Sequence, residues 1–208
     1  MKIEIGAIAL RIVPCVSEKD MGEKIRAFIA ISMPEPVLQA IVETQDTLRG
    51  SGLKIRWVRK DGIHLTLKFL GDIDRDDVEK IRAAMERATK AFSPVTLRAE
   101  GLGVFPDLKR PRVVWVGLSG DVEVLRTLQS DLESQLNGLG FPREKRLFKG
   151  HLTLGRVKGR LDRAKLSKAL QALREFRTES FTAQSLVLFR SDLRPNGAVY
   201  SKLAEVAL

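Results

Sequence analysis

The sequence predicts an α+β protein made of two similar lobes, related by an approximate twofold axis around a central cleft. The first observation behind this fold class is a repeated tetrapeptide, His-Leu-Thr-Leu (HLTL), at residues 64–67 and 151–154, an offset of 87 (151 minus 64). The second is that the same ungapped offset aligns FIAIS at 28–32 with WVGLS at 115–119. The repeats are therefore expected at about residues 26–103 and 113–190, with the two HLTL strands facing each other across the cleft.

The elements of the first repeat follow from its apolar patterns and turn residues. The apolar run at 26–32 indicates a strand buried on both faces. Pro36 suits the first turn of a helix, and apolar residues at helical spacing continue to Gly50, where this helix should end. Further strands are expected at 54–58, 64–70 and 94–103. A second helix, before the last of these strands, should carry Val78, Ile81, Met85 and Ala88 toward the core.

The acidic segment GDIDRDD at 71–77 can be interpreted in two ways. Its alternating carboxylates are typical of a calcium loop, but such a loop requires glycine at its sixth position and glutamate at its twelfth. This chain has Asp77 and Ala83 there. We therefore interpret Asp74 as the cap of the second helix, with further acids in the first helical turn.

The second repeat shows the same order of elements. Strands are expected at 112–118 and 151–157, and Asp121 should cap the helix that carries Leu125, Leu128, Leu132 and Leu136. Another helix should begin near Asp162. Strands at 181–190 and 198–205 close the chain, joined through a turn at residues 194–197, where the Asn-Gly pair is a strong hairpin signal.

Length and composition indicate a soluble protein with a sizeable core. The chain has 208 residues, of which 44% are apolar and 30% charged, and no apolar run approaches the length of a membrane span. We expect residues 1–20 to be an extension and residues 21–208 to form a single bilobal domain. Cys15 is the one cysteine and cannot form an internal disulfide, which fits a reducing, cytoplasmic location. We also expect the protein to be a monomer.

The charge points to a polyanionic partner. The formal net charge is +10, from 36 basic and 26 acidic residues. Between residues 143 and 163 there are eight basic and two acidic residues, a net charge of +6, and this segment brackets the second histidine.

The only two histidines of the chain, His64 and His151, each open a copy of HLTL. Because alternate residues of a strand share a face, each histidine should project with the threonine two positions later, Thr66 or Thr153, while the leucines anchor the strand. Histidine can gain or lose a proton near neutral pH. Two opposed imidazoles could remove a proton on one side of a phosphorus centre and deliver one on the other, and the hydroxyls could bind the non-bridging oxygens.

The paired His-x-Thr-x motifs, their separation, the FIAI strand and the closing segment FRSDLRPNGAVY resemble the 2H phosphoesterase superfamily. Within it, the chain is most similar to the RNA 2′,3′-cyclic phosphodiesterases, also called 2′-5′ RNA ligases. The resemblance covers roughly residue 24 to the C-terminus. Gly150 is a departure, since family members often have proline just before the second histidine.

The resemblance implies a fold of two pseudo-twofold-related lobes of antiparallel sheet with helices outside, no metal and no cofactor. It makes His64 and His151 the catalytic pair and Thr66 and Thr153 the phosphate-binding residues. The implied activity is hydrolysis of the terminal 2′,3′-cyclic phosphate of RNA, tRNA fragments among the substrates, to a 2′-phosphate. Reversible, ATP-independent 2′-5′ ligation could use the same groups.

Three further residues are candidates for substrate contact, each with an alternative. Lys68 has the strand parity of His64, although a solvated strand end would explain it equally well. Arg156 has the opposite parity to His151 unless the strand twists or bulges, whereas the resemblance favours a basic residue there. Phe148 could stack on a nucleobase, with core packing as the alternative. The tryptophans, Trp57 and Trp115, lie in apolar strands and are expected in the core.

The two histidines also allow two other classes of function, a metal site and a non-catalytic RNA-binding site. A zinc or iron site needs a third or fourth ligand, and no cysteine or carboxylate lies at ligand spacing beside either histidine. A non-catalytic protein that binds RNA ends, with histidines that only hydrogen-bond phosphate, remains as the alternative to an enzyme.

Overall fold

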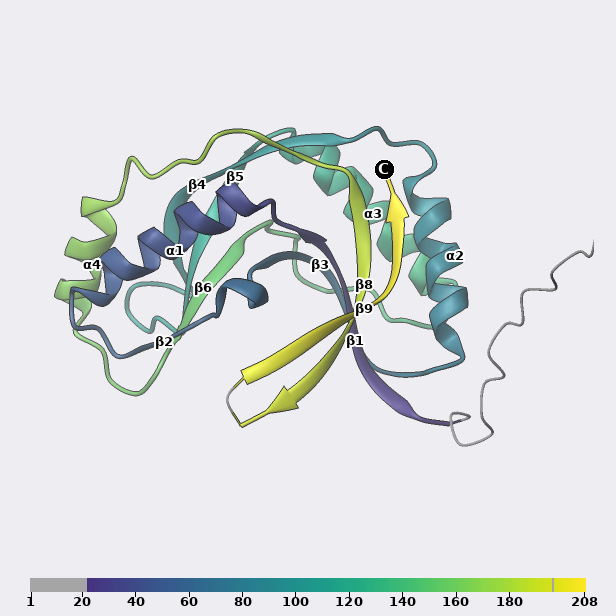
Figure 1. The fold of residues 1–208 in the computed structure, drawn as a ribbon, viewed down its shortest axis with the longest axis horizontal. Coiled ribbons are helices and arrows are strands. Elements are labelled where there is room, and N and C mark those ends of the chain that lie inside the picture. Colours follow the sequence, from purple (N-terminus) through teal and green to yellow (C-terminus); the bar gives the residue numbers. More distant parts are fainter. Residues whose placement is uncertain (1–21, 196) are drawn as a thin grey trace, which may run out of the picture.

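The structure is a computed structural model that describes residues 22–195 and 197–208. The expected extension at residues 1–20 and the expected start near Met21 lie outside the described residues. Figure 1 shows an antiparallel sheet with helices packed against it.

The first repeat contributes four strands, two α-helices and a short 3-10 helix. In chain order these are β1 (Lys24–Ser32), α1 (Glu35–Arg49), β2 (Ile55–Trp57), η2 (Lys60–Gly62), β3 (His64–Asp74), α2 (Asp77–Thr89) and β4 (Val95–Phe105). The remaining elements are β5 (Val113–Gly120), α3 (Val122–Asn137), β6 (Leu152–Val157), α4 (Arg163–Ala172), β7 (Phe181–Ala183), β8 (Ser185–Arg194) and β9 (Gly197–Ala207).

Several boundaries differ from the predictions for physical reasons. Strand β3 continues to Asp74, which pairs with Lys24 of β1, so Asp76 and not Asp74 is the N-cap of α2. The strand predicted at 181–190 is divided at Gln184, because β7 pairs with β4 whereas β8 pairs with β1. The hairpin between β8 and β9 is confirmed, and so is the start of a helix near Asp162, whose side chain accepts a hydrogen bond from the Lys165 amide as the N-cap of α4.

The two HLTL strands lie side by side and do not face each other as predicted. The strand order is β7-β4-β5-β6-β3-β1-β8-β9, with β2 added beside β6. Strands β3 and β6 are central and antiparallel neighbours, and Leu65 pairs with Leu152. The two repeats thus share one continuous sheet, and their pseudo-twofold axis passes between these strands.

Each HLTL motif ends in a β-bulge. In β3, Thr66 pairs with Ala30 and Lys68 with Ile29, so Leu67 is the extra residue. In β6, the extra residue is the equivalent Leu154, between Thr153 and Gly155. A bulge reverses the alternation of side chains beyond it, so the period-2 pattern of each HLTL strand breaks at the fourth residue of the motif.

The first helix of each repeat packs behind the HLTL strand of the other repeat. In α1, Gln45 is buried and its amide donates to the carbonyls of Val58 (2.9 Å) and Leu154 (2.8 Å). In α3, buried Gln129 donates to the carbonyl of Leu67 at 3.3 Å. Each bulge carbonyl is thus bound from the opposite repeat. Accordingly, α1 lies with α4 at one end of the molecule and α3 with α2 at the other (Figure 1).

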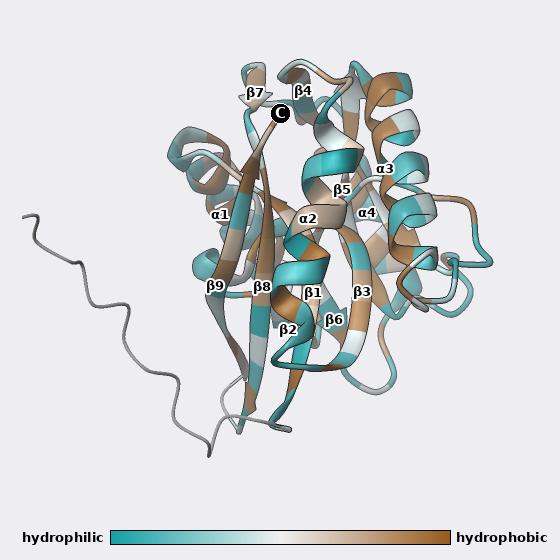
Figure 2. Cartoon of the chain, turned by 90° about the vertical axis from the view of Figure 1, so that its right-hand side faces the viewer, coloured by the Kyte–Doolittle hydropathy of each residue, from teal (hydrophilic) through white to brown (hydrophobic). Residues whose placement is uncertain are grey.

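The core lies between the sheet and these helices. Figure 2 shows apolar residues along β1, β3 and β8, with α2 lying across these strands. The motif leucines belong to this core: Leu65, Leu152 and Leu154 are completely buried and Leu67 is 4% exposed. The leucine half of the parity prediction is therefore confirmed.

Replacing Gln45 by leucine should destabilise the fold by about 1–3 kcal/mol, because the carbonyls of Val58 and Leu154 would lose a buried donor. Urea unfolding followed by circular dichroism measures this loss. The matched control is Gln39→Leu, the same chemical change at an exposed position of α1. Equal stabilities for the two variants would show that the buried amide does not support the bulge.

Candidate active site

Four polar side chains converge at the seam between the repeats. His64 begins β3, and His151 lies directly before β6, one residue outside the strand that was expected to include it. The pairing of Leu65 with Leu152 places His64 opposite Thr153 and Thr66 opposite His151 on the face that the leucines leave free. All four are partly buried. Each histidine thus lies beside the threonine of the other repeat, and the two histidines occupy diagonal corners.

The histidine rings are held by equivalent backbone contacts. Nδ1 of His151 lies 2.7 Å from the carbonyl oxygen of Lys149, and His64 hydrogen-bonds to the backbone of Gly62. Lys149 is Gly62 shifted by the repeat offset of 87. A ring that donates through Nδ1 keeps Nε2 available as a base, or as an acid once protonated. The backbone of each repeat therefore sets the ring orientation that proton transfer requires.

Aromatic residues surround both imidazoles. Phe28 lies 4.7 Å from His64 between ring centroids, and Tyr200 meets the same imidazole edge-on at 5.2 Å. Around His151, Phe105 lies 4.9 Å away and Trp115 6.3 Å away. The expected core position of Trp115 is wrong: the ring is partly exposed beside His151. Trp57, also partly exposed, does pack against the core.

Burial lowers the pKa of both histidines. It lowers the pKa of His64 to about 4, against a smaller opposing effect of the Gly62 hydrogen bond. The pKa of His151 is also lowered, chiefly by burial, with the Lys149 hydrogen bond opposing and the charges of Lys149 and Arg156 adding to the decrease. Both imidazoles are therefore neutral at pH 7 in the free protein, and either can act as a base.

A hollow of about 560 Å³ opens over this face of the sheet, lined by His64, Thr66 and Thr153 among others. Arg56 and Arg156 also line it and are directly paired across β2 and β6. Like charges directly opposite each other destabilise a sheet. Neither arginine has a carboxylate partner within the described residues, so an anion in the hollow would relieve their repulsion.

The bulges decide the positions of two candidate substrate contacts. Beyond the bulge at Leu154, Arg156 lies on the histidine face. This is the position expected for Arg156 if the strand bulges. Beyond Leu67 the same reversal moves Lys68 to the opposite face, so its predicted shared parity with His64 is wrong. Lys68 is 6% exposed. Phe69, which is Arg156 shifted by 87 positions, takes the place on the histidine face and is 65% exposed.

Lys68 instead belongs to a buried polar network. Its ammonium lies 2.7 Å from the Glu133 carboxylate and donates to the carbonyl of Pro142 at 2.7 Å. Glu133 also accepts a hydrogen bond from the Glu144 amide. These contacts tie the loop that leads to His151 to β3 and α3. Phe148, in the same loop, packs against the core, as its alternative interpretation stated.

Several residues at the site were not singled out from the sequence, among them Phe28, Lys149 and Tyr200. Phe28 and Lys149 could have been found, since the offset of 87 makes them equivalent to Trp115 and Gly62. The Lys149 ammonium lies 4.4 Å from the Trp115 ring centroid, which places a cation beside His151. Tyr200 carries no such signal, because its strand follows the second repeat.

Within the described ranges, no cluster of three or more His, Cys, Asp or Glu side chains could hold a metal ion. In the same part of the chain, no helix is both long and apolar enough to cross a membrane.

Comparison with known proteins agrees with the repeat and the site. The family model for LigT-like phosphoesterases matches twice, at residues 31–115 and 116–200. The RNA 2′,3′-cyclic phosphodiesterase of Methanothermobacter thermautotrophicus is 32% identical, over 86% of this chain and 97% of that protein. The protein of the same name from Archaeoglobus fulgidus is 34% identical, again over 86% and 97%.

Solved structures share the fold. TT0787 of Thermus thermophilus superposes with a TM-score of 0.74 at 28% identity, covering 88% of this chain and 98% of that one. Escherichia coli LigT, in its complex with 3′-AMP, gives a TM-score of 0.71 at 25% identity, covering 89% and 99%. The chain, with its two matched repeats, therefore belongs to the family of LigT-like phosphoesterases.

Proposed function

We propose that this protein hydrolyses the terminal 2′,3′-cyclic phosphate of RNA to a 2′-phosphate without a metal ion. The observation that carries the proposal is the seam constellation, in which each histidine lies opposite the threonine of the other repeat. The relatives named RNA 2′,3′-cyclic phosphodiesterase support the substrate class.

The reaction uses His64 and His151 as an acid and a base. Nε2 of one neutral imidazole removes a proton from water as its oxygen attacks phosphorus. The bond from phosphorus to the ribose 3′ oxygen breaks, and the other imidazole, in its protonated form, donates a proton to that oxygen. The product carries a 2′-phosphate and a 3′-hydroxyl. The two histidines lie at diagonal corners of the seam, so one can serve the attacking oxygen and the other the leaving oxygen on opposite sides of the phosphorus, as in-line displacement requires.

The remaining polar groups bind the phosphate. The hydroxyls of Thr66 and Thr153 donate to the non-bridging oxygens, where negative charge gathers. Arg56 and Arg156 supply positive charge from the wall of the hollow. In the bound state this anion faces both imidazoles and favours their protonated forms, so the acid gains its proton when substrate binds.

A 5′-hydroxyl in place of water would give 2′-5′ ligation with the same two imidazoles and no ATP. The activity on tRNA fragments, the monomeric state and the cytoplasmic location stay predictions from the sequence.

Replacing either histidine by glutamine should lower kcat by about 10²- to 10⁴-fold, because one proton transfer loses its catalyst. The assay is chromatographic analysis of an RNA oligonucleotide with a 2′,3′-cyclic phosphate end, with EDTA present. Binding of the same oligonucleotide should survive in both variants.

Two results would contradict this assignment. Unchanged turnover in His64→Gln or His151→Gln would remove that residue from the chemistry, and loss of turnover with EDTA in the unmutated protein would indicate a metal enzyme. An unmutated protein that binds the oligonucleotide but releases no product would instead be the non-catalytic RNA-end-binding protein.

The pH dependence of kcat/KM should be bell-shaped with its maximum below pH 6.5. This parameter reports the free enzyme, which needs one protonated and one neutral histidine. Burial holds the pKa of His64 at about 4 and lowers the pKa of His151, so the required acid is lost as pH rises above the higher of the two values. The profile of kcat should lie at higher pH, because bound phosphate favours protonation.

Proton NMR of the two imidazoles gives an independent measurement. Both midpoints should lie below 6.5 in the free protein, and at least one should rise when a nucleoside 2′-monophosphate is added; the single-histidine variants assign the signals. A free-protein midpoint above 6.5 for either imidazole, or a kcat/KM that climbs through pH 7, would refute the neutral pair.

A further inference from the structure

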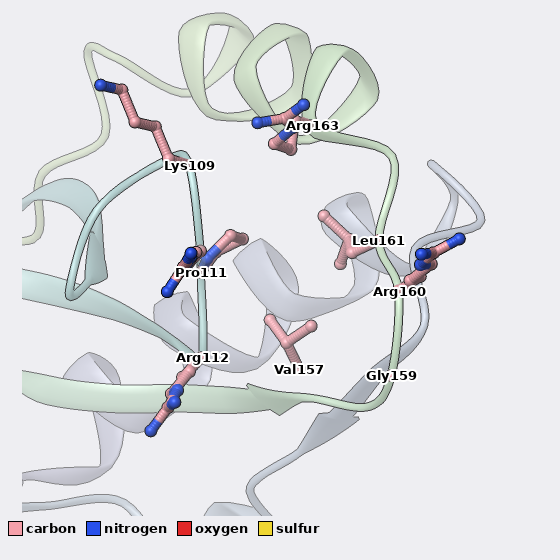
Figure 3. A pocket seen from close by; sticks show the side chains of 9 residues that line it. Lys109, Pro111, Arg112, Val157, Gly159, Arg160, Leu161 and Arg163 are labelled. Carbon is pink, nitrogen blue, oxygen red and sulfur yellow. The ribbon is translucent and has the colours of Figure 1, made fainter.

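A second hollow, outside the catalytic one, is lined by cations. It has a volume of about 600 Å³ and lies between the loop that joins β4 to β5 and the loop that joins β6 to α4 (Figure 3). No acidic residue lines it. Five basic residues do: Lys109, Arg110, Arg112, Arg160 and Arg163.

The positive charge of this basic hollow is not neutralised within the part of the chain that the structure describes. None of its five cations forms an ion pair there, whereas many other surface cations do. The acids in the two loops are bound to backbone amides: Asp107 accepts from Lys109 and Arg110, and Asp162 from Lys165. The five cations outnumber these two carboxylates, so an excess of positive charge remains around the hollow, and a polyanion relieves the resulting repulsion.

The shape of the basic hollow suits a nucleic-acid strand. Figure 3 shows the apolar side chains of Pro111, Val157 and Leu161 between the two loops, with basic side chains around them. Arg163 is the first residue of α4, whose N-terminus adds partial positive charge. Basic groups that follow the phosphates are the electrostatic part of single-stranded RNA binding, and the aliphatic side chains between them offer apolar contact without base stacking.

The basic hollow follows the catalytic one along the chain but lies on the other face of β6, because neighbouring strand residues point to opposite faces. Arg156 lines the catalytic hollow and the next residue, Val157, lines the basic one. From Thr153 to Val157 the strand advances by about 10–13 Å, the lower value because of the bulge at Leu154, and the path round the strand from one face to the other adds to this distance. A single nucleotide bound at the seam does not span that distance, but a strand of several nucleotides does.

We propose that the basic hollow binds phosphates of the RNA strand on the 5′ side of the cyclic end, several nucleotides from the reacting phosphorus. This inference rests on the proposed function, since a 2′,3′-cyclic phosphate stands at a 3′ terminus and the rest of the strand extends in the 5′ direction. The site selects RNA strands over free cyclic nucleotides, because short substrates do not reach it.

The test compares two substrates in a variant that lacks three of these cations, Lys109→Gln/Arg160→Gln/Arg163→Gln. For a ten-nucleotide RNA with a cyclic end, kcat/KM should fall on the order of tenfold or more, and its log–log dependence on salt should become shallower by about 2. For a nucleoside 2′,3′-cyclic monophosphate, kcat/KM should stay within about twofold.

The matched control removes the same charge from exposed positions on α2, its C-terminus and α3: Lys80→Gln/Lys90→Gln/Arg126→Gln. It should leave the oligonucleotide rate and its salt dependence close to those of the unmutated protein. Equal losses in the two triple variants, or equal losses on both substrates, would overturn the basic hollow as an RNA site. Failure of the unmutated protein to turn over either substrate would refute the proposed function instead.

Discussion

The antiparallel pairing of Leu65 with Leu152 is the contact on which the rest of this structure depends. It joins two repeats into one sheet and brings two distant copies of a tetrapeptide into register. Because strand side chains alternate, a slip of one residue in either strand would turn its histidine and threonine into the core and its leucines into the hollow. The site exists only in this register, and burial of the four motif leucines favours it.

The first helix of each repeat packs behind the HLTL strand of the other repeat, and this packing makes the register difficult to change. The glutamines of α1 and α3 bind the bulge carbonyls of the opposite repeat, and the Lys68–Glu133 pair links β3 to α3 and to the loop before His151. Removing one member of this buried ion pair would leave the other charge unpaired in the core. The pair therefore holds β3, α3 and the loop in one arrangement, even where its net contribution to stability is small. The strand that carries each histidine is therefore supported by the other repeat, while the backbone of its own repeat orients the ring.

The sequence was sufficient to predict the repeat, the four seam residues and most elements, because each rests on local spacing. It failed where the outcome depends on pairing between distant strands. Strict alternation placed Lys68 with His64 and Arg156 away from His151, and one bulge in each strand reversed both positions. The side-by-side arrangement of the HLTL strands was missed for the same reason. Trp115 was assigned to the core because its strand is apolar, although its repeat equivalent, Phe28, also lies against a histidine.

Electrostatics and burial act on the site in the same direction. Burial lowers the pKa of both imidazoles, and the charges of Lys149 and Arg156 lower the pKa of His151 further, so both effects disfavour a protonated histidine. A cyclic phosphate brings the negative charge that reverses this preference at the place where an acid is needed. The cations that help to keep His151 neutral also attract the anion, so in the proposed reaction charging of the acid is coupled to the arrival of substrate. An uncharged ligand in the same hollow would gain neither the attraction nor the proton.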